Sequence, residues 1–213
     1  MKKISYESKE FRNKEATEYL AQLKTEGKRI IDVGASLSDW TYNYIDAIVD
    51  INKFETDKIF FQGNITLTDV WDDVESYVEK NGKFDFSICS HTLEDISNPL
   101  MVCKKLEKIS DAGLIMIPSK FIELGRHEGQ YRGWIHHRWV WNIEGEKLVG
   151  YPKVNFIEYD YSLDSIPRQL NDDNIQIVLF WQKTIPIEII NGDFLGPSTN
   201  HVIGYYQNLI YKN

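Results

Sequence analysis

Between residues 28 and 119, short apolar runs alternate with segments of helical periodicity, and this alternation limits the fold more than any other feature of the chain. The apolar runs lie at residues 29–34, 46–52, 58–64, 83–91 and 114–119. Strands separated by helices are joined as parallel strands through right-handed crossovers. The pattern therefore predicts an α/β fold with a mostly parallel sheet.

Three segments have the boundary signals of helices. Residues 7–26 place apolar positions among charges and end at a glycine, and residues 1–27 are therefore expected to form an N-terminal helix. Residues 68–81 follow Thr68, a candidate N-cap. The third helix starts at Asn98, which can cap it, with proline at the first helical position.

The alternation stops after residue 119. Residues 120–155 are rich in aromatic and basic side chains, and "RWVWNIEGEKLVGYPK" is typical of a β-hairpin that turns at Glu144 and Gly145. We expect this segment to be an insertion after the fifth strand, within a single domain spanning residues 1–213. Residues 174–190 supply one or two late strands.

Composition excludes several classes of partner. The formal charge of −8 disfavours a broad nucleic-acid surface, because binding to phosphates depends on clustered Lys and Arg. The first ten residues contain no apolar run, so neither a signal peptide nor a membrane anchor is expected, and the default location is cytoplasmic. Cys89 and Cys103 lie in apolar segments, which predicts buried, reduced thiols. The sequence leaves the oligomeric state open.

The stretch "KRIIDVGASLSDW", residues 28–40, places Asp32 just before a turn of small residues. In an open parallel sheet, the ligand crevice lies at the carboxyl ends of the strands, where the strand order reverses. A dinucleotide site requires G-x-G-x-x-G, but this turn offers Gly34, Ser36 and Asp39 at those positions. A carboxylate at residue 32 would also repel a diphosphate.

A cationic nucleoside without phosphates suits the same turn. Asp50 ends the second apolar run, where an acid can accept hydrogen bonds from both hydroxyls of a ribose. Two acids around a small turn therefore predict an adenosyl ligand with a positively charged tail. S-adenosylmethionine, which has an ammonium and a sulfonium group, is such a ligand.

Five motifs in order carry a family resemblance. They are "IIDVGAS", "AIVDIN", "FFQGNIT", "FDFSICSHTLEDISNP" and "AGLIMIPS", within residues 28–119. Together they resemble the class I S-adenosylmethionine-dependent methyltransferases, particularly the group whose fourth strand runs into an "SHxLEH" motif. Here "LED" replaces "LEH", which leaves Asp95 without an implied role, and serines at 36 and 38 replace common glycines.

The resemblance implies a Rossmann-like, doubly wound sheet, S-adenosylmethionine as cofactor and S-adenosylhomocysteine as product. It implies that Asp32, Gly34 and Ala35 lie beside the methionine part, Asp50 and Ile51 at the ribose, Asn64 at the adenine amine, and Ser90 and His91 at the floor of the methyl-transfer site. Trp71 is expected in the core.

The acceptor site is expected in "HEGQYRGWIHHRWVW", residues 127–141. Histidine is the natural base near neutral pH, so His136 or His137 is the first candidate, followed by His91 and His127. The remaining candidates are substrate contacts: Arg132 and Arg138 for a carboxylate or phosphate, and Tyr131 and Trp134 for a sugar or ring face. The expected partner is a small polar acceptor, a sugar or sugar-linked metabolite methylated on oxygen.

Alternatives remain open. If "WIHHRWVW" is a strand, alternate residues face opposite sides, so some aromatics join the core and the adjacent histidines diverge too far to share a metal easily. No metal is predicted, although a site of His91 with Glu94 or Asp95, or with a loop histidine, is a minor candidate. The chain could also be a non-catalytic adenosyl-binding or partner-binding module, or a nicotinamide-dependent reductase.

Overall fold

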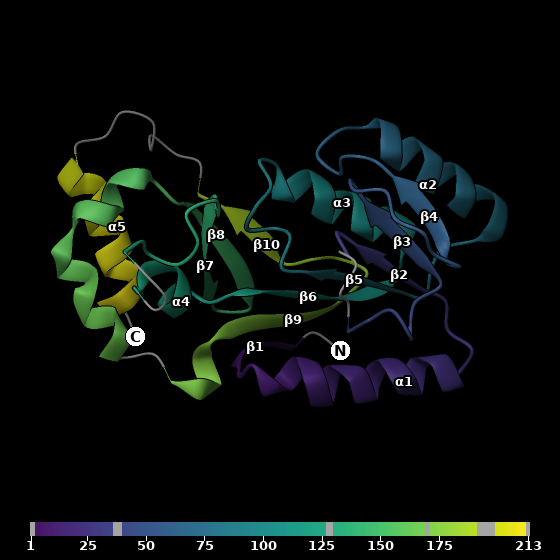
Figure 1. Ribbon diagram of the computed structural model, residues 1–213, viewed down its shortest axis with the longest axis horizontal. Coiled ribbons are helices and arrows are strands. Elements are labelled where there is room, and N and C mark those ends of the chain that lie inside the picture. Colours follow the sequence, from purple (N-terminus) through teal and green to yellow (C-terminus); the bar gives the residue numbers. More distant parts are fainter. Residues whose placement is uncertain (1–2, 36–39, 127–129, 169–170, 191–198, 212–213) are drawn as a thin grey trace.

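A seven-stranded sheet forms the centre of the molecule. The computed structural model describes residues 3–35, 40–126, 130–168, 171–190 and 199–211 (Figure 1). The strands are β1 (Lys3–Glu7), β2 (Ile30–Val33), β3 (Ala47–Asp50), β4 (Ile59–Gln62), β5 (Phe86–Ser90), β6 (Ala112–Pro118) and β9 (Gln176–Gln182). Their order is β1-β9-β6-β5-β2-β3-β4. β9 runs antiparallel to both of its neighbours, β1 and β6, and all the other pairs are parallel. The predicted α/β fold with a mostly parallel sheet is confirmed.

The strand order reverses between β2 and β5. From β2 the chain builds outward through β3 to β4, and from β5 it builds the other way to β6. The carboxyl ends of β2 and β5 therefore lie side by side at the point where their connections diverge. This is the edge at which open α/β sheets bind ligands.

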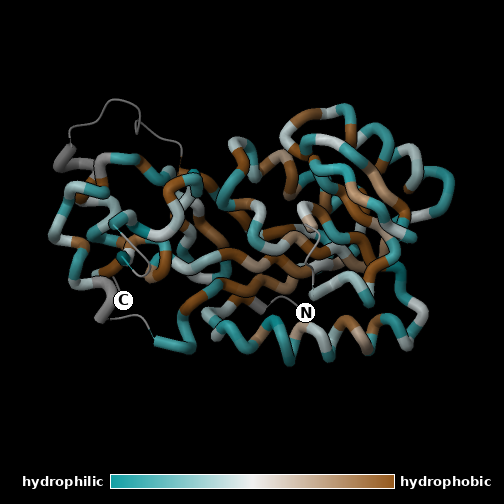
Figure 2. Tube along the Cα trace, viewed as in Figure 1, coloured by the Kyte–Doolittle hydropathy of each residue, from teal (hydrophilic) through white to brown (hydrophobic). Residues whose placement is uncertain are grey.

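Helices cover both faces of the sheet (Figure 1). One face carries η1 (Arg12–Ala16) and α1 (Thr17–Thr25), and the other carries α2 (Asp69–Asn81) and α3 (Pro99–Ile109). The brown strands at the centre of Figure 2 mark the apolar layer between them. Trp71 is fully buried there, as predicted, and the Asn98 side chain accepts a hydrogen bond from Met101 N at 3.2 Å. None of the described helices is both long and apolar enough to cross a lipid bilayer.

The first 27 residues are not a single helix. Residues Lys3–Glu7 form β1, which pairs antiparallel with β9 at the edge of the sheet. Ile4 and Tyr6 alternate with polar residues and pack on the core, which is the period of two of a strand, but the segment is only five residues long. Helical structure begins after this strand, close to the predicted residue 7.

The insertion after β6 is longer than residues 120–155. It contains α4 (Lys120–Leu124), β7 (Trp139–Glu144), β8 (Lys147–Pro152), η2 (Asn155–Tyr159), η3 (Tyr161–Arg168) and η4 (Asp172–Asn174). β7 and β8 pair as an antiparallel hairpin that turns at Gly145 and Glu146.

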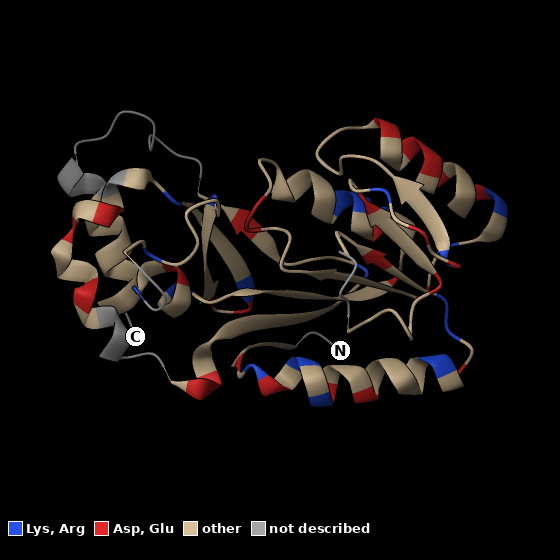
Figure 3. Cartoon of the chain, viewed as in Figure 1, with Lys and Arg blue, Asp and Glu red and all other residues tan. Residues whose placement is uncertain are grey.

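The C-terminal part of the chain packs on the insertion. β10 (Ile187–Ile189) adds to β8, and α5 (Thr199–Tyr211) packs against the insertion around a separate, smaller core. Charged side chains lie mainly on the helices and loops, whereas the central strands carry few (Figure 3).

Candidate functional site

Two buried carboxylates lie at the tips of β2 and β3. Asp32 is 1% exposed, and its Oδ2 accepts a hydrogen bond from Thr41 Oγ1 at 2.5 Å. Asp50 is 6% exposed, and its Oδ1 accepts one from Asn52 N at 2.7 Å. The adjacent Ile51 is 58% exposed, which is unusual for a large apolar side chain. This edge of the sheet combines negative charge with an uncovered apolar surface.

The turn after β2 contains a glycine, which was expected to let a ligand approach the backbone, but the structure gives another reason for it. Gly34 has φ +82°, and a Cβ added there would lie 2.4 Å from Thr92 Oγ1. The glycine therefore makes room for Thr92, from the turn after β5, rather than for a ligand at that point. Ala35 is buried, and residues 36–39, which complete the turn, lie outside the described residues.

Asn64 follows β4 and is half-buried. Its Oδ1 accepts hydrogen bonds from Thr66 N at 2.9 Å and Thr66 Oγ1 at 2.8 Å. The two acceptor positions of this oxygen are thus used within the loop. A contact with an adenine amine through Oδ1 would require Thr66 to give up a hydrogen bond.

The turn after β5 holds strained and buried groups. Ser90 ends the strand, and His91 adopts φ +50°, a conformation uncommon for residues other than glycine. His91 Nδ1 lies 3.4 Å from Oε1 of Glu94. Glu94 is fully buried, and neither of its carboxylate oxygens accepts a hydrogen bond from a described residue. Burial raises the pKa of Glu94.

His136 and His137 lie together in a turn. β7 begins only at Trp139, so the alternative in which the two histidines diverge along a strand does not hold. Their ring centroids are 4.7 Å apart. Asp95 Oδ1 lies 3.7 Å from His136 Nε2 and 3.5 Å from His137 Nε2. Asp95, which the sequence indicated only as a minor metal-ligand candidate, thus faces both histidines.

A buried glutamate orients His137. Glu123, on α4, is fully buried, and its Oε1 lies 2.7 Å from His137 Nδ1. Burial lowers the pKa of His137, but the hydrogen bond with Glu123 and the charges of Glu123, Glu94 and Asp95 outweigh it and raise the pKa overall. His137 is therefore held in one orientation by a carboxylate, as histidines are in many reactive sites.

Lys153 completes this arrangement. Its Nζ donates to Glu123 Oε2 at 2.8 Å and to the carbonyl oxygens of Arg132 and Trp134 at 2.8 and 2.9 Å. A Cβ at Gly133 would lie 2.7 Å from Glu123 Oε2, so the loop passes close over the glutamate. Sequence reasoning missed Glu123 and Lys153, because only the fold brings α4 and the end of β8 to this loop.

Arg132 is a structural residue and not the substrate ligand that the sequence indicated. Its side chain is fully buried. The guanidinium donates to the carbonyls of Leu124 at 2.9 Å, Ile157 at 2.9 Å and Asp160 at 2.5 Å, and pairs with Asp164 at 2.6 Å. Four of its five N–H donors are thus committed to holding the insertion together, and the guanidinium is fully buried.

The other predicted acceptor contacts are accessible. Tyr131 is exposed, and Trp134 is exposed with its ring 5.1 Å from that of His137. Arg138 is exposed as well, and its backbone N donates to Glu94 O at 2.7 Å. His127 lies outside the described residues.

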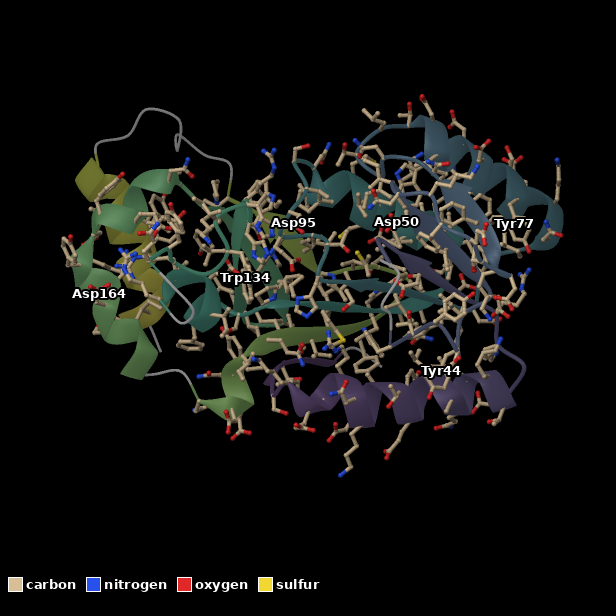
Figure 4. The ribbon with its side chains drawn as sticks, in the orientation of Figure 1. Tyr44, Asp50, Tyr77, Asp95, Trp134 and Asp164 are labelled. Carbon is tan, nitrogen blue, oxygen red and sulfur yellow. The ribbon has the colours of Figure 1, made fainter. Side chains whose placement is uncertain are left out.

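Two cavities adjoin the histidines. A cavity of about 620 Å³ is lined by residues that include Arg126, Tyr131, His137, Glu158, Tyr159 and Tyr161. A second, of about 380 Å³, is lined by residues that include Ser97, His136, His137 and Arg138. In the view of Figure 4, Asp95 lies between Asp50, at the tip of β3, and Trp134 in the insertion.

No family model matches the chain, and no curated protein matches it. Solved structures with a similar fold include an S-adenosylmethionine-dependent methyltransferase from Mesorhizobium loti, with 10% identity, coverage of 79% of this chain and 98% of the other, and a TM-score of 0.37. A methyltransferase described as a possible histamine N-methyltransferase from Thermotoga maritima has 9% identity, coverage of 82% and 92%, and a TM-score of 0.44. The N-terminal domain of EvdMO1, solved with S-adenosylhomocysteine and D-fucose, has 10% identity, coverage of 79% and 83%, and a TM-score of 0.40. These values are too low to transfer a substrate or a site residue to this chain.

Proposed function

We propose that this chain is an S-adenosylmethionine-dependent methyltransferase that methylates an oxygen of a small polar acceptor, such as a sugar or a sugar-linked metabolite. The observation that carries the proposal is the pair of buried carboxylates, Asp32 and Asp50, beside the exposed Ile51 at the reversal of the strand order. Carboxylates at this edge favour a cationic ligand over a diphosphate, and an acid at the end of a strand here, as Asp50 is, can accept from ribose hydroxyls.

The turn after β5 connects this edge to the histidines. Thr92 packs on Gly34 at the tip of β2, while two residues further on Glu94 O accepts a hydrogen bond from Arg138 N. Asp95, the next residue, faces His136 and His137. A cofactor over β2 and β3 and an acceptor beside the histidines would therefore meet above His91.

The reaction requires alignment and the loss of one proton. The carbon–sulfur bond of the cofactor breaks as the acceptor oxygen takes the methyl group, and the hydroxyl proton leaves to a base. His137, oriented by Glu123, and the exposed His136 are the candidates on the acceptor side, with His91 at the strand tip. Tyr131 and Trp134 supply exposed ring faces for a sugar, and Arg138 an exposed cation.

Calorimetry with S-adenosylhomocysteine tests the cofactor. We expect saturable binding and a higher melting temperature at excess ligand, because a ligand of the folded state stabilises it. Asp50→Ala should weaken binding about 10-fold or more, since hydrogen bonds to a charged group contribute roughly 1.5–3 kcal/mol. Asp73→Ala, an exposed acid on α2, is the matched control and should bind as the unmodified chain does.

Four results would contradict the proposal or one of its parts. Absence of binding removes the cofactor, and tight binding of NADH in its place favours a reductase. Binding of S-adenosylhomocysteine with no product from a panel of sugars and sugar nucleotides favours a non-catalytic module. Full single-turnover activity in both His136→Ala and His137→Ala would remove these histidines from proton transfer.

A further inference from the structure

We propose that Asp95, His136 and His137 form a binding site for one divalent transition-metal ion, with Zn²⁺ as the test ion. One ligand atom from each residue lies within 4.8 Å of the other two. Two imidazoles and a carboxylate are a donor set that Zn²⁺ and its neighbours in the first transition row accept. The site itself is independent of the methyltransferase proposal, whereas its catalytic role rests on it.

The distances fit a metal better than they fit hydrogen bonds. Asp95 Oδ1 lies 3.7 Å from His136 Nε2 and 3.5 Å from His137 Nε2, too far for either to be a good hydrogen bond. Ligand atoms on a tetrahedral ion with bonds of 2.0–2.1 Å lie about 3.3–3.4 Å apart. Asp95 and His137, at 3.5 Å, are close to this spacing, and the exposed His136 side chain can turn toward the same point.

His137 is prepared as a ligand by its other nitrogen. Its Nδ1 lies 2.7 Å from Glu123 Oε1, so the proton is held on Nδ1 and the Nε2 lone pair faces Asp95. A carboxylate behind a ligating histidine fixes its tautomer and orientation in metal sites. Lys153, on the second oxygen of Glu123, holds that carboxylate in turn.

The carboxylates around the cluster also favour a bound cation. Asp95 Oδ1 and both carboxylate oxygens of Glu94 are buried and accept no hydrogen bond from a described residue. For Glu94, whose side chain is 1% exposed and lies 3.4 Å from the His91 ring, a lack of hydrogen bonds is costly in a protein interior. Within the described contacts of the cluster, Lys153 is the one ammonium against the carboxylates of Glu94, Asp95 and Glu123. A dication would balance this excess.

The open side of the cluster faces the cavities. His136 and His137 both line the 380 Å³ cavity, and His137 also lines the larger one. A site with three protein ligands leaves a position for water or substrate, and a divalent ion there lowers the pKa of a bound oxygen. On the methyltransferase proposal, the ion would bind the acceptor hydroxyl, and His136 and His137 would act as ligands rather than as the base. The hydroxyl proton would then pass to His91, the remaining candidate base.

Metal binding by the purified chain, free of any polyhistidine tag, tests the proposal. After removal of metal with EDTA and dialysis against micromolar Zn²⁺, elemental analysis should find one ion per chain. Co²⁺ in place of Zn²⁺ should give the visible absorption of a low-coordinate site. His136→Ala, His137→Ala and Asp95→Asn should each weaken binding by more than about 100-fold, because loss of an outer partner alone costs 10- to 100-fold.

Two further variants separate a ligand from a general structural effect. Glu123→Gln should weaken binding by about 10- to 100-fold, as expected for an outer partner of a ligand. His91→Ala should retain the ion with unchanged affinity, because His91 is outside the proposed set. Thermal unfolding without metal shows whether each variant is folded, and Asp95→Asn, of nearly identical shape, is the least disruptive of them.

The outcomes are distinguishable from those of the cofactor test. One ion per chain, lost in the three ligand variants, supports the site even if S-adenosylhomocysteine fails to bind. No retained ion, or equal affinity in folded Asp95→Asn, overturns the site and leaves the cofactor proposal intact when S-adenosylhomocysteine binds the metal-free chain. Loss of the ion in His91→Ala alone would show that the ligand set is wrong.

Discussion

Substitution of Gly34 measures how tightly the turns at the carboxyl ends of β2 and β5 are packed. At this position φ is +82° and a Cβ would lie 2.4 Å from Thr92 Oγ1, so Gly34→Ala meets both backbone strain and a steric clash. We expect a loss of about 2–4 kcal/mol in the free energy of unfolding, since each effect costs roughly 1–3 kcal/mol. Urea denaturation measures it.

Gly27 provides the control for backbone strain alone. It has φ +74°, but no atom lies within 4 Å of an added Cβ. Gly27→Ala should therefore cost only about 1 kcal/mol. Equal losses at the two positions would show that Thr92 does not fill the space at Gly34.

The sequence showed that Arg132 carries donors for an anion or carbonyl, but it did not show whether these donors bind a substrate or the protein itself. Arg132→Met keeps much of the side-chain volume but removes the donors to Leu124, Ile157 and Asp160 and the pairing with Asp164. Breaking one side of a buried charged network costs roughly 3–5 kcal/mol, which we expect in urea denaturation. A stable variant that had lost only acceptor binding would restore the substrate role.

At the scale of elements, Asp85 joins the starts of β2 and β5. Its Oδ2 accepts from Arg29 N at 2.9 Å, and its Oδ1 lies 3.2 Å from Lys28 Nζ. The hydrogen bond from Arg29 N lowers the pKa of Asp85, and Lys28 adds to this effect against the opposing effect of burial. The folded state therefore prefers the charged carboxylate.

This preference predicts an acid-dependent contribution to stability. Because the pKa is lower in the folded state, the contribution is present above the unfolded pKa of about 4 and is lost as the pH falls through the folded value. Asp85→Asn should be less stable than the parent at pH 7 and should lose less stability on acidification. Urea denaturation across pH 2–7 measures both, and parallel pH profiles of the two proteins would contradict the linkage.

Three hydrophobic cores lie among the described residues. Two pack helices on opposite faces of the sheet, α2 and α3 on one face and η1 with α1 on the other, and the third and smaller core joins α4, the hairpin, η2, η3 and α5. Tyr206 is fully buried in the smaller core, where its hydroxyl donates to Pro152 O and accepts from Val154 N. The cavity beside His137, which Lys153 also lines, is built on this core, because the hydroxyl of Tyr206 holds the residues on either side of Lys153.

Tyr206→Ala should therefore loosen the acceptor side selectively. Removing a buried aromatic side chain costs roughly 3–5 kcal/mol. Hydrogen exchange should quicken in α4, β7 and β8, while β2, β3 and β5 keep their protection and S-adenosylhomocysteine still binds. Equal loss of protection in the sheet and in the smaller core would show that they unfold as one unit.

The central sheet was predictable because its information is local. Each strand between residues 28 and 119 is an apolar run of its own, and handedness rules then restrict how the runs connect. The placement of Asp50 at the end of β3 and of Asn98 as a helix cap follows from the same local patterns. β1 was missed because five residues carry only two apolar positions.

The acceptor side was not predictable in the same way. The composition of residues 127–141 indicated the kinds of side chain available for a site. Whether Arg132 is buried, and whether His136 and His137 converge, depends on elements distant in the chain. Glu123 and Asp95 contact the histidines, and Lys153 contacts Glu123, from three separate segments. Periodicity by itself determined the α/β sheet and its acidic strand ends, since backbone hydrogen bonding and burial repeat along the chain. Which side chains share a site was decided only by tertiary packing, because contacts between segments far apart in the chain leave no periodic trace in it.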